Sequence, residues 1–151
     1  MLFQLESLSP SFIEEVLPLL RAHKEEVAHF QDIELNPDWQ RYNRLNEAGG
    51  LRIFTVRDCS MLVGYSWFFV SPNPHYKDSI QANQDIVYLR KDYRGKGKGR
   101  DFILWCDAML EAEGVEVVYQ HVKAKPELDF SPLLEGIGYE LVDKILARRL
   151  K

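Results

Sequence analysis

The segment Asp85–Arg100 (DIVYLRKDYRGKGKGR) constrains the fold most, because a strand pattern runs there into a basic glycine loop and then into a helix. Glycine stands at positions 95, 97 and 99 and reaches backbone conformations that other residues rarely adopt. Successive backbone N–H groups of such a loop can turn toward one point and form a nest for an anion. The N-terminus of the following helix adds unpaired N–H groups and the positive end of its dipole. The loop therefore predicts a phosphate or pyrophosphate site.

The distribution of charge agrees with this prediction. The 151 residues carry a formal net charge of −4, yet residues 90–100 contain six Lys or Arg and one Asp. This short segment therefore carries a net charge of +5, and the rest of the chain carries a net charge of −9. A protein that binds nucleic acid over its whole surface is typically basic throughout. We therefore expect a compact phosphate ligand and disfavour nucleic acid as a partner.

Several other classes of protein do not fit the sequence. No run of about 18 apolar residues suggests a membrane span, and the N-terminus lacks the basic start of a signal peptide. Cys59 and Cys106 form no CxxC pair, which favours a reducing cytoplasm. The four histidines show no metal-ligand spacing, so we expect no metal site.

Hydrophobic periodicity predicts a single α/β domain over residues 1–151, with a mixed central sheet of about six to seven strands and about four helices. Strands are expected at 2–8, 51–57, 61–70, 80–89, 115–122 and 139–150, with a loop at 71–78. Helices are expected from a capping box at Ser11–Glu14, between Asn36-Pro37 and Gly49-Gly50, at 100–113, and within 125–138. Pro18 predicts a kink or an early break in the first helix.

The glycine loop departs from two common phosphate-binding motifs. A Walker loop needs GxxxxGK[ST], and a dinucleotide fingerprint needs GxGxxG; Arg100 breaks both patterns. The segment does match Arg-x-x-Gly-x-Gly as Arg94, Gly97 and Gly99. With its flanking strand and helix, it resembles the GNAT superfamily of acetyl-CoA-dependent N-acetyltransferases. LLEGIGYELV at 133–142 resembles the end of that family, and the NPHY loop and closing GYELVDKILARRL are similar to GNAT proteins of tailed bacteriophages.

The resemblance implies acetyl-CoA as the cofactor. The fourth and fifth strands would splay apart around the pantetheine arm, and amides of Arg94–Gly99 would hold the pyrophosphate. A backbone N–H would polarise the thioester oxygen while a neutral amine attacks directly. The cofactor-binding residues implied in this way are Val87, Tyr88, Leu89, Arg94, Gly95, Lys96, Gly97, Lys98, Gly99 and Arg100.

Two residues are candidates for the general base that an amine needs near neutral pH. Asp85 occupies the position where many members of the family place a catalytic glutamate. A structural carboxylate that pairs with a cation is the alternative. His121 is the second candidate, with a structural, hydrogen-bonded histidine as its alternative. The family's tyrosine acid is missing, because Leu134 stands in its place, and Leu128 replaces a pantetheine-side asparagine.

Contacts to the acceptor are implied for the first helices and for the loop between the third and fourth strands. Glu26, His29, His75 and Tyr76 are the candidate substrate-binding residues, with a solvated helix face and an ordered loop as alternatives. The leading function is acetyl transfer to a primary amine of a small molecule or protein. A catalytically weak GNAT-like module that binds CoA or a macromolecule is the alternative. A homodimer through the last strands and a cytoplasmic location (the host's, for a phage protein) complete the expectations.

Overall fold

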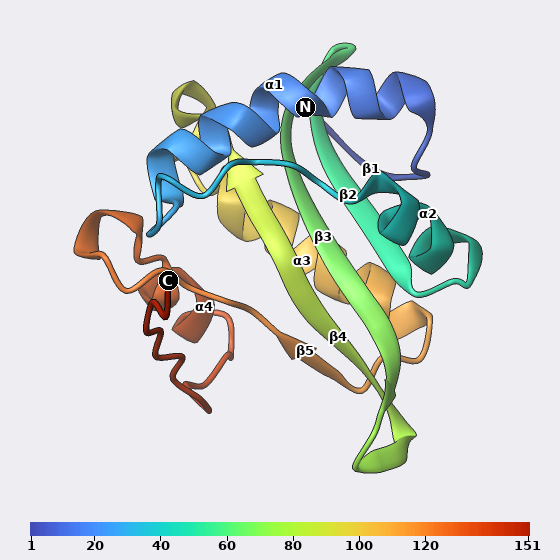
Figure 1. Cartoon of the computed structure of the whole chain (residues 1–151). Helices are drawn as coiled ribbons and strands as arrows, with labels where there is room; N and C mark the ends of the chain where they lie inside the picture. Colours follow the sequence, from blue (N-terminus) through green and yellow to red (C-terminus); the bar gives the residue numbers. More distant parts are fainter.

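The computed structural model describes residues 1–151 and shows one five-stranded sheet in the order β1-β2-β3-β4-β5 (Figure 1). The strands are β1 (Leu2–Glu6), β2 (Leu51–Asp58), β3 (Met61–Asn73), β4 (Tyr76–Leu89) and β5 (Val117–Tyr119). The first four strands pair antiparallel, and β5 pairs parallel to β4. The predicted mixed sheet is confirmed, but it has five strands instead of six or seven.

Helices cover both faces of this sheet (Figure 1). They are α1 (Pro10–Val27), α2 (Trp39–Glu47), α3 (Lys98–Ala112) and α4 (Ser131–Glu135), with 3-10 turns at Lys91–Tyr93 and Pro126–Leu128. On one face, α1 packs on a core that includes Ile53, Tyr65 and Trp67. On the other face, α3 packs on a second core around Phe54 and Phe68. Alternation along the strands sends side chains to both cores, so the domain has three layers.

The start of α1 differs from the prediction. Ser9 caps the helix by accepting a hydrogen bond from the N–H of Phe12, and Pro10 occupies the first turn. The predicted capping box at Ser11 is therefore wrong. Pro18 does not end the helix either, since α1 continues to Val27. Burial of the apolar face on both sides of Pro18 compensates for the lost backbone hydrogen bond.

Two further element boundaries, at the start of α2 and between β3 and β4, differ from the prediction. The helix α2 is capped by Asp38, whose side chain accepts from the N–H of Arg41, instead of by Asn36. The predicted loop at 71–78 is wrong, because β3 and β4 continue into a tight hairpin at its centre. The carboxamide of Asn73 supports this turn by accepting from the N–H of His75 and donating to Gln81. Prolines at strand ends are compatible with such an extension, which explains the error.

The predicted last strand is also wrong, because residues 139–151 contain no regular secondary structure. A strand needs a hydrogen-bonding partner, and this segment pairs with no edge of the sheet within the chain. It is held by a hydrogen bond from Tyr139 to Asp107 (2.8 Å) and an ion pair between Arg149 and Asp32 (2.7 Å). Its apolar side chains Leu141, Val142, Ile145, Leu146 and Leu150 are exposed.

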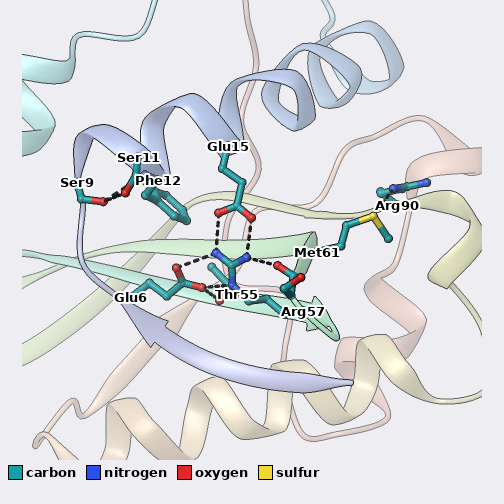
Figure 2. A network of polar contacts seen from close by, with 10 residues as sticks. Glu6, Ser9, Ser11, Phe12, Glu15, Thr55, Arg57, Met61 and Arg90 are labelled. Carbon is teal, nitrogen blue, oxygen red and sulfur yellow. Dashed lines mark hydrogen bonds and ion pairs between the residues drawn. The ribbon is translucent and has the colours of Figure 1, made fainter.

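A polar network joins α1 to the first two strands (Figure 2). The guanidinium of Arg57 on β2 donates to Glu6 at the end of β1 (2.7 and 3.0 Å) and to Glu15 on α1 (2.6 and 2.8 Å). Thr55 donates to Glu6 as well. Burial raises the pKa of Glu6, but its bonds to Arg57 and Thr55 outweigh burial and leave that pKa below its usual range. The network thus holds the N-terminal part of the domain together as charged groups.

Candidate active site

The strands β4 and β5 diverge after a short paired stretch. Pairing is confined to Gln81–Asn83 with Val117–Tyr119, whereas β4 continues to Leu89. The backbone of residues 84–89 therefore faces an open fork on the β5 side. The predicted splay of the fourth and fifth strands is confirmed. The side chain of Gln84 bridges the start of this fork by accepting from the N–H of His121 (2.7 Å).

The loop after β4 is an anion nest in its backbone conformation. Gly95, Lys96 and Gly97 have consecutive positive φ angles of 87°, 52° and 76°, and such a run points successive N–H groups to the same side. A Cβ built on Gly95 or Gly97 meets no atom within 4 Å, so the space in front of the loop is open. The N–H groups that donate to no protein group are those of Gly95, Lys96, Gly97, Gly99 and Arg100.

Not every predicted residue of the loop is free to bind a ligand. The N–H of Arg94 donates to the carbonyl of Lys91, and the N–H of Lys98 donates to that of Gly95, both at 3.2 Å. The expectation that every amide from Arg94 to Gly99 faces a pyrophosphate is therefore wrong for these two. Formation of the 3-10 turn and of the first helical turn uses their N–H groups. Lys96, Lys98 and Arg100 still bring three positive charges to the loop and the start of α3, where Lys98 lies over the ring of Tyr93 (5.6 Å) and Arg100 lies 3.6 Å from Asp101.

The side chain of Arg94 is committed within the protein. Its guanidinium donates to both oxygens of Glu26 on α1 (2.6 and 3.0 Å) and to the carbonyl of Leu89 (2.7 Å). It also lies over the ring of Tyr88, 5.4 Å from its centroid. The bond from Arg94 holds the pKa of Glu26 below its usual range. Glu26, predicted to bind the acceptor, therefore links α1 to the glycine loop instead.

Asp85 lies on the open edge of β4 and accepts a hydrogen bond from the hydroxyl of Tyr42 at 2.5 Å. The pKa of Asp85 is raised overall, because burial outweighs the lowering by the bond from Tyr42 and by the nearby charge of His121. Burial and this same bond raise the pKa of Tyr42, which stays protonated. Sequence reasoning missed Tyr42, because 43 residues separate it from Asp85 and no motif connects them.

His121 follows the end of β5 by two residues and is exposed. The structure therefore brings both candidate bases to the fork, with Asp85 on one strand and His121 beyond the other. The imidazole of His121 makes no hydrogen bond within the chain, so the alternative of a structural, hydrogen-bonded histidine is not supported. Leu134, which stands where the family has its tyrosine acid, is buried at 4% exposure, and Leu128 lies in the 3-10 turn before α4.

The remaining predicted substrate residues do not gather in one pocket. His75 and Tyr76 lie at the tip of the β3–β4 hairpin, where Tyr76 is 68% exposed. Nine residues of strand, or roughly 30 Å, separate Tyr76 from Asp85. His29 is exposed beside Phe30, just beyond α1. The extension of both hairpin strands, which sequence reasoning took for a loop, moves His75 and Tyr76 away from the fork.

Sequence reasoning also missed the half-buried His23 and the close contact of Gly64 near the end of β4. His23 on α1 bonds through Nδ1 to the hydroxyl of Tyr65 (2.8 Å) and stacks on Tyr88. Burial, with the charges of Lys123 and Arg94, lowers the pKa of His23 to about 4, so the ring is neutral near pH 7. Gly64 on β3 allows close approach, since a Cβ there would lie 2.8 Å from Leu89.

Neither a metal centre nor a membrane helix is part of this structure. No group of three or more His, Cys, Asp or Glu side chains is placed to hold a metal ion. None of the helices has both the length and the apolar character needed to cross a membrane.

Comparison with known proteins identifies the fold. No family model and no curated protein matches the sequence. Solved structures do match, among them the ribosomal-protein-alanine N-acetyltransferase of Brucella melitensis biovar Abortus 2308, with a TM-score of 0.72 and 22% identity over 99% of this chain and 100% of that one. Glucosamine-6-phosphate N-acetyltransferase of Arabidopsis thaliana matches with a TM-score of 0.69 and 11% identity, at 100% coverage of both chains.

A transcriptional regulator of Bacillus halodurans C-125 also matches, with a TM-score of 0.75 and 12% identity over 99% of this chain and 100% of that one. The chain therefore has the fold of the GNAT acetyltransferases. The names of these neighbours differ in acceptor and in role, so the fold alone does not specify an acceptor.

Proposed function

We propose that this protein is an acetyl-CoA-dependent N-acetyltransferase that transfers the acetyl group to a primary amine by direct attack. The observation that carries this proposal is the group of five unpartnered N–H groups, in the glycine loop and the first turn of α3, beside the open edge of β4. A nest and a helix N-terminus together favour a phosphate group. The adjacent open strand edge offers backbone hydrogen bonds to an extended amide-containing chain. CoA combines these two features in one molecule.

The residues present fit that cofactor. The N–H groups of Gly95, Gly97 and Gly99 would hold the pyrophosphate, with Lys96, Lys98 and Arg100 supplying positive charge. The open edge at Val87–Leu89 would hold the pantetheine arm. The carbonyl of Leu89 already accepts from Arg94, so the neighbouring backbone groups are the ones free to bind. Bound acetyl-CoA supplies an activated acetyl thioester, and a backbone N–H on this edge would stabilise the developing oxyanion.

Asp85 is the residue that we assign as the general base. It must accept a proton from the acceptor's ammonium group, directly or through a bridging water, so that the neutral amine can attack, and it lies at the fork where the two strands open. The hydroxyl of Tyr42 orients one carboxylate oxygen and favours the charged form, which is the form that accepts a proton. The exposed imidazole of His121 can pass the proton on to solvent.

No side chain is assigned as a general acid. Leu134 is buried at the position of the family's tyrosine, and Tyr139 donates its hydroxyl proton to Asp107 instead. A thiolate is a good leaving group, so its departure can proceed with a proton from water. The same observation favours a second candidate function, that of a weakly active or inactive module that binds CoA.

One assay separates the two candidates. Purified protein is incubated with acetyl-CoA and a panel of primary amines, and acetylated product is detected by mass spectrometry. The proposal predicts product, with a loss of about 100-fold or more in Asp85→Asn, because general-base catalysis contributes about that much. Binding of CoA without product from any amine would contradict the enzyme and favour the binding module. The cytoplasmic location and the likeness to phage proteins stay predictions from the sequence.

A further inference from the structure

A cavity of about 200 Å³ opens on the α1 face of the sheet, beside Asp85. It lies between α1, the segment 28–38, α2 and the central strands, and it was not anticipated from the sequence. The residues that line it are Leu20, Glu34, Leu35, Asn36, Pro37, Trp39, Tyr42, Trp67 and Ile86. Most of this lining is aromatic or aliphatic, and none of the predicted substrate residues belongs to it.

The aromatic walls of this cavity hold one another in place. The ring of Tyr42 meets the buried Trp67 edge-to-face with centroids 5.3 Å apart, and it stacks on Phe69 at 6.2 Å. Trp39 lies 5.9 Å from Tyr42 and 6.4 Å from Trp67. Aromatic pairs at these distances stabilise a fixed arrangement. The cavity is therefore a formed pocket, and a ligand need not build it by moving the chain.

The polar groups that the pocket can offer lie at its rim, where Glu34 and the carboxamide of Asn36 are both exposed. The hydroxyl of Tyr42 is engaged with Asp85, and the indole N–H of Trp67 is buried away from the pocket surface. Glu34 at the rim is exposed, whereas Asp32, nearby in the sequence, is paired with Arg149 (2.7 Å) and Asp38 caps α2. The pocket thus combines an apolar floor with a polar rim that carries the carboxylate of Glu34. A hydroxyl-rich acceptor would lose hydrogen bonds to water on entering it.

We propose that this pocket selects the acceptor, and that the acceptor is a primary amine carrying a compact apolar or aromatic group. The inference rests on the proposed function and names its substrate class. A dry cavity of about 150 Å³ accommodates benzene, so about 200 Å³ takes one ring or a branched alkyl group. Tyr42 and Ile86 both line the pocket. Asp85 accepts a hydrogen bond from Tyr42 and directly precedes Ile86 in the chain. An apolar group seated there leaves its amine next to Asp85.

The test compares 2-phenylethylamine with ethylamine as acceptors. The pocket predicts a kcat/KM at least about tenfold higher for 2-phenylethylamine, which is the discrimination that even one extra methylene gives in an apolar pocket. Leu35→Phe fills the pocket from its half-buried edge and should abolish the preference while acetyl-CoA binding stays intact. Leu104→Phe, the same exchange on the outer surface of α3, should keep it. Equal kcat/KM values for the two amines would overturn the inference, and so would a preference that survives in Leu35→Phe.

A binding measurement keeps the inference testable apart from catalysis. The indole N–H resonances of Trp39 and Trp67 should shift when 2-phenylethylamine is added, at concentrations where ethylamine has no effect. Trp105 packs on Phe3 and Phe54 on the opposite face and serves as an internal reference. If neither amine is acetylated, the proposed function fails in this assay, yet selective shifts still support the pocket. No shift, or an equal shift of Trp105, would overturn it.

Discussion

Opposing interactions act on the pKa of Asp85 and so determine the pH range in which it can act as a base. Burial favours its protonated form, whereas the hydroxyl of Tyr42 and the charge of His121 favour the carboxylate. A base must be ionised to accept a proton, so Tyr42 extends the pH range in which Asp85 can work. This interaction depends on one hydroxyl group and can be removed without emptying the aromatic pocket.

The variant Tyr42→Phe should move the acidic limb of the kcat/KM profile to higher pH. Loss of the hydroxyl raises the pKa of Asp85, so a higher pH is needed to ionise it. The free energy of unfolding should fall by about 1–3 kcal/mol, because a partly buried carboxylate loses a partner. Tyr139→Phe is the control, because it removes a similar bond, to Asp107 on α3, that does not involve Asp85. An acidic limb that stays in place in Tyr42→Phe would contradict the role of Tyr42.

His23 should make the protein less stable in mild acid. Its pKa is near 4 when folded and 6.5 in its ordinary state, so between these values only the unfolded chain binds the proton. The free energy of unfolding should therefore decrease as pH falls from 6.5 to 4, by up to about 3 kcal/mol. Urea titrations across this range should show a weaker pH dependence in His23→Gln. The exposed His29→Gln is the control and should retain the wild-type slope.

At the scale of elements, the loop between β4 and α3 was predictable, because its information is local. Alternating glycines, basic residues and a following helix all lie within Asp85–Arg100. The exact donors were not predictable, since the N–H groups of Arg94 and Lys98 are used by adjacent turns. The contact of Tyr42 with Asp85 depends on how α2 docks on the sheet, which no local pattern encodes.

The variant Gly97→Ala should weaken binding of acetyl-CoA by at least about tenfold, because its Cβ enters the open space of the nest. Its positive φ of 76° should also cost about 1–2 kcal/mol of stability. Gly114→Ala is matched, since Gly114 has a φ of 90° at the other end of α3 and open space around it. Calorimetric titration should show weakened acetyl-CoA binding in Gly97→Ala alone. Urea unfolding should show a similar loss of unfolding free energy in both variants. Equal affinities would contradict the nest.

At the scale of the whole molecule, Arg57 joins β2 to β1 and α1, whose partner residues Glu6 and Glu15 lie 51 and 42 residues earlier in the sequence (Figure 2). Arg57→Ala should lower the free energy of unfolding by about 3 kcal/mol, because Glu6 would be left partly buried without its partner. Arg52→Ala removes one ion pair, with Glu113, together with bonds to the carbonyls of Gly49 and Leu51, and should cost about 1 kcal/mol. Urea denaturation of both variants measures the difference. Equal losses would show that the network adds nothing beyond one surface pair.

The order of elements and the three-layer architecture were predictable for most of the chain. Residues 139–151 were the main exception, since their strand-like alternation finds no pairing edge in a single copy. Alternation predicts a preference for pairing, whereas a strand also requires a partner. The homodimer implied by the resemblance stays a prediction. The same reasoning explains the hairpin, where pairing of β3 with β4 extended both strands across the predicted loop.

The central claim is that the nest beside the β4 edge binds acetyl-CoA, and calorimetric titration of the wild-type protein tests it most directly. The predicted result is saturable binding of one equivalent, with a Kd on the order of tens of micromolar or below, weakening as salt is raised. Lys96, Lys98 and Arg100 provide the charge that makes this binding salt-dependent. Absence of saturable binding at low salt, in folded protein, would contradict the claim.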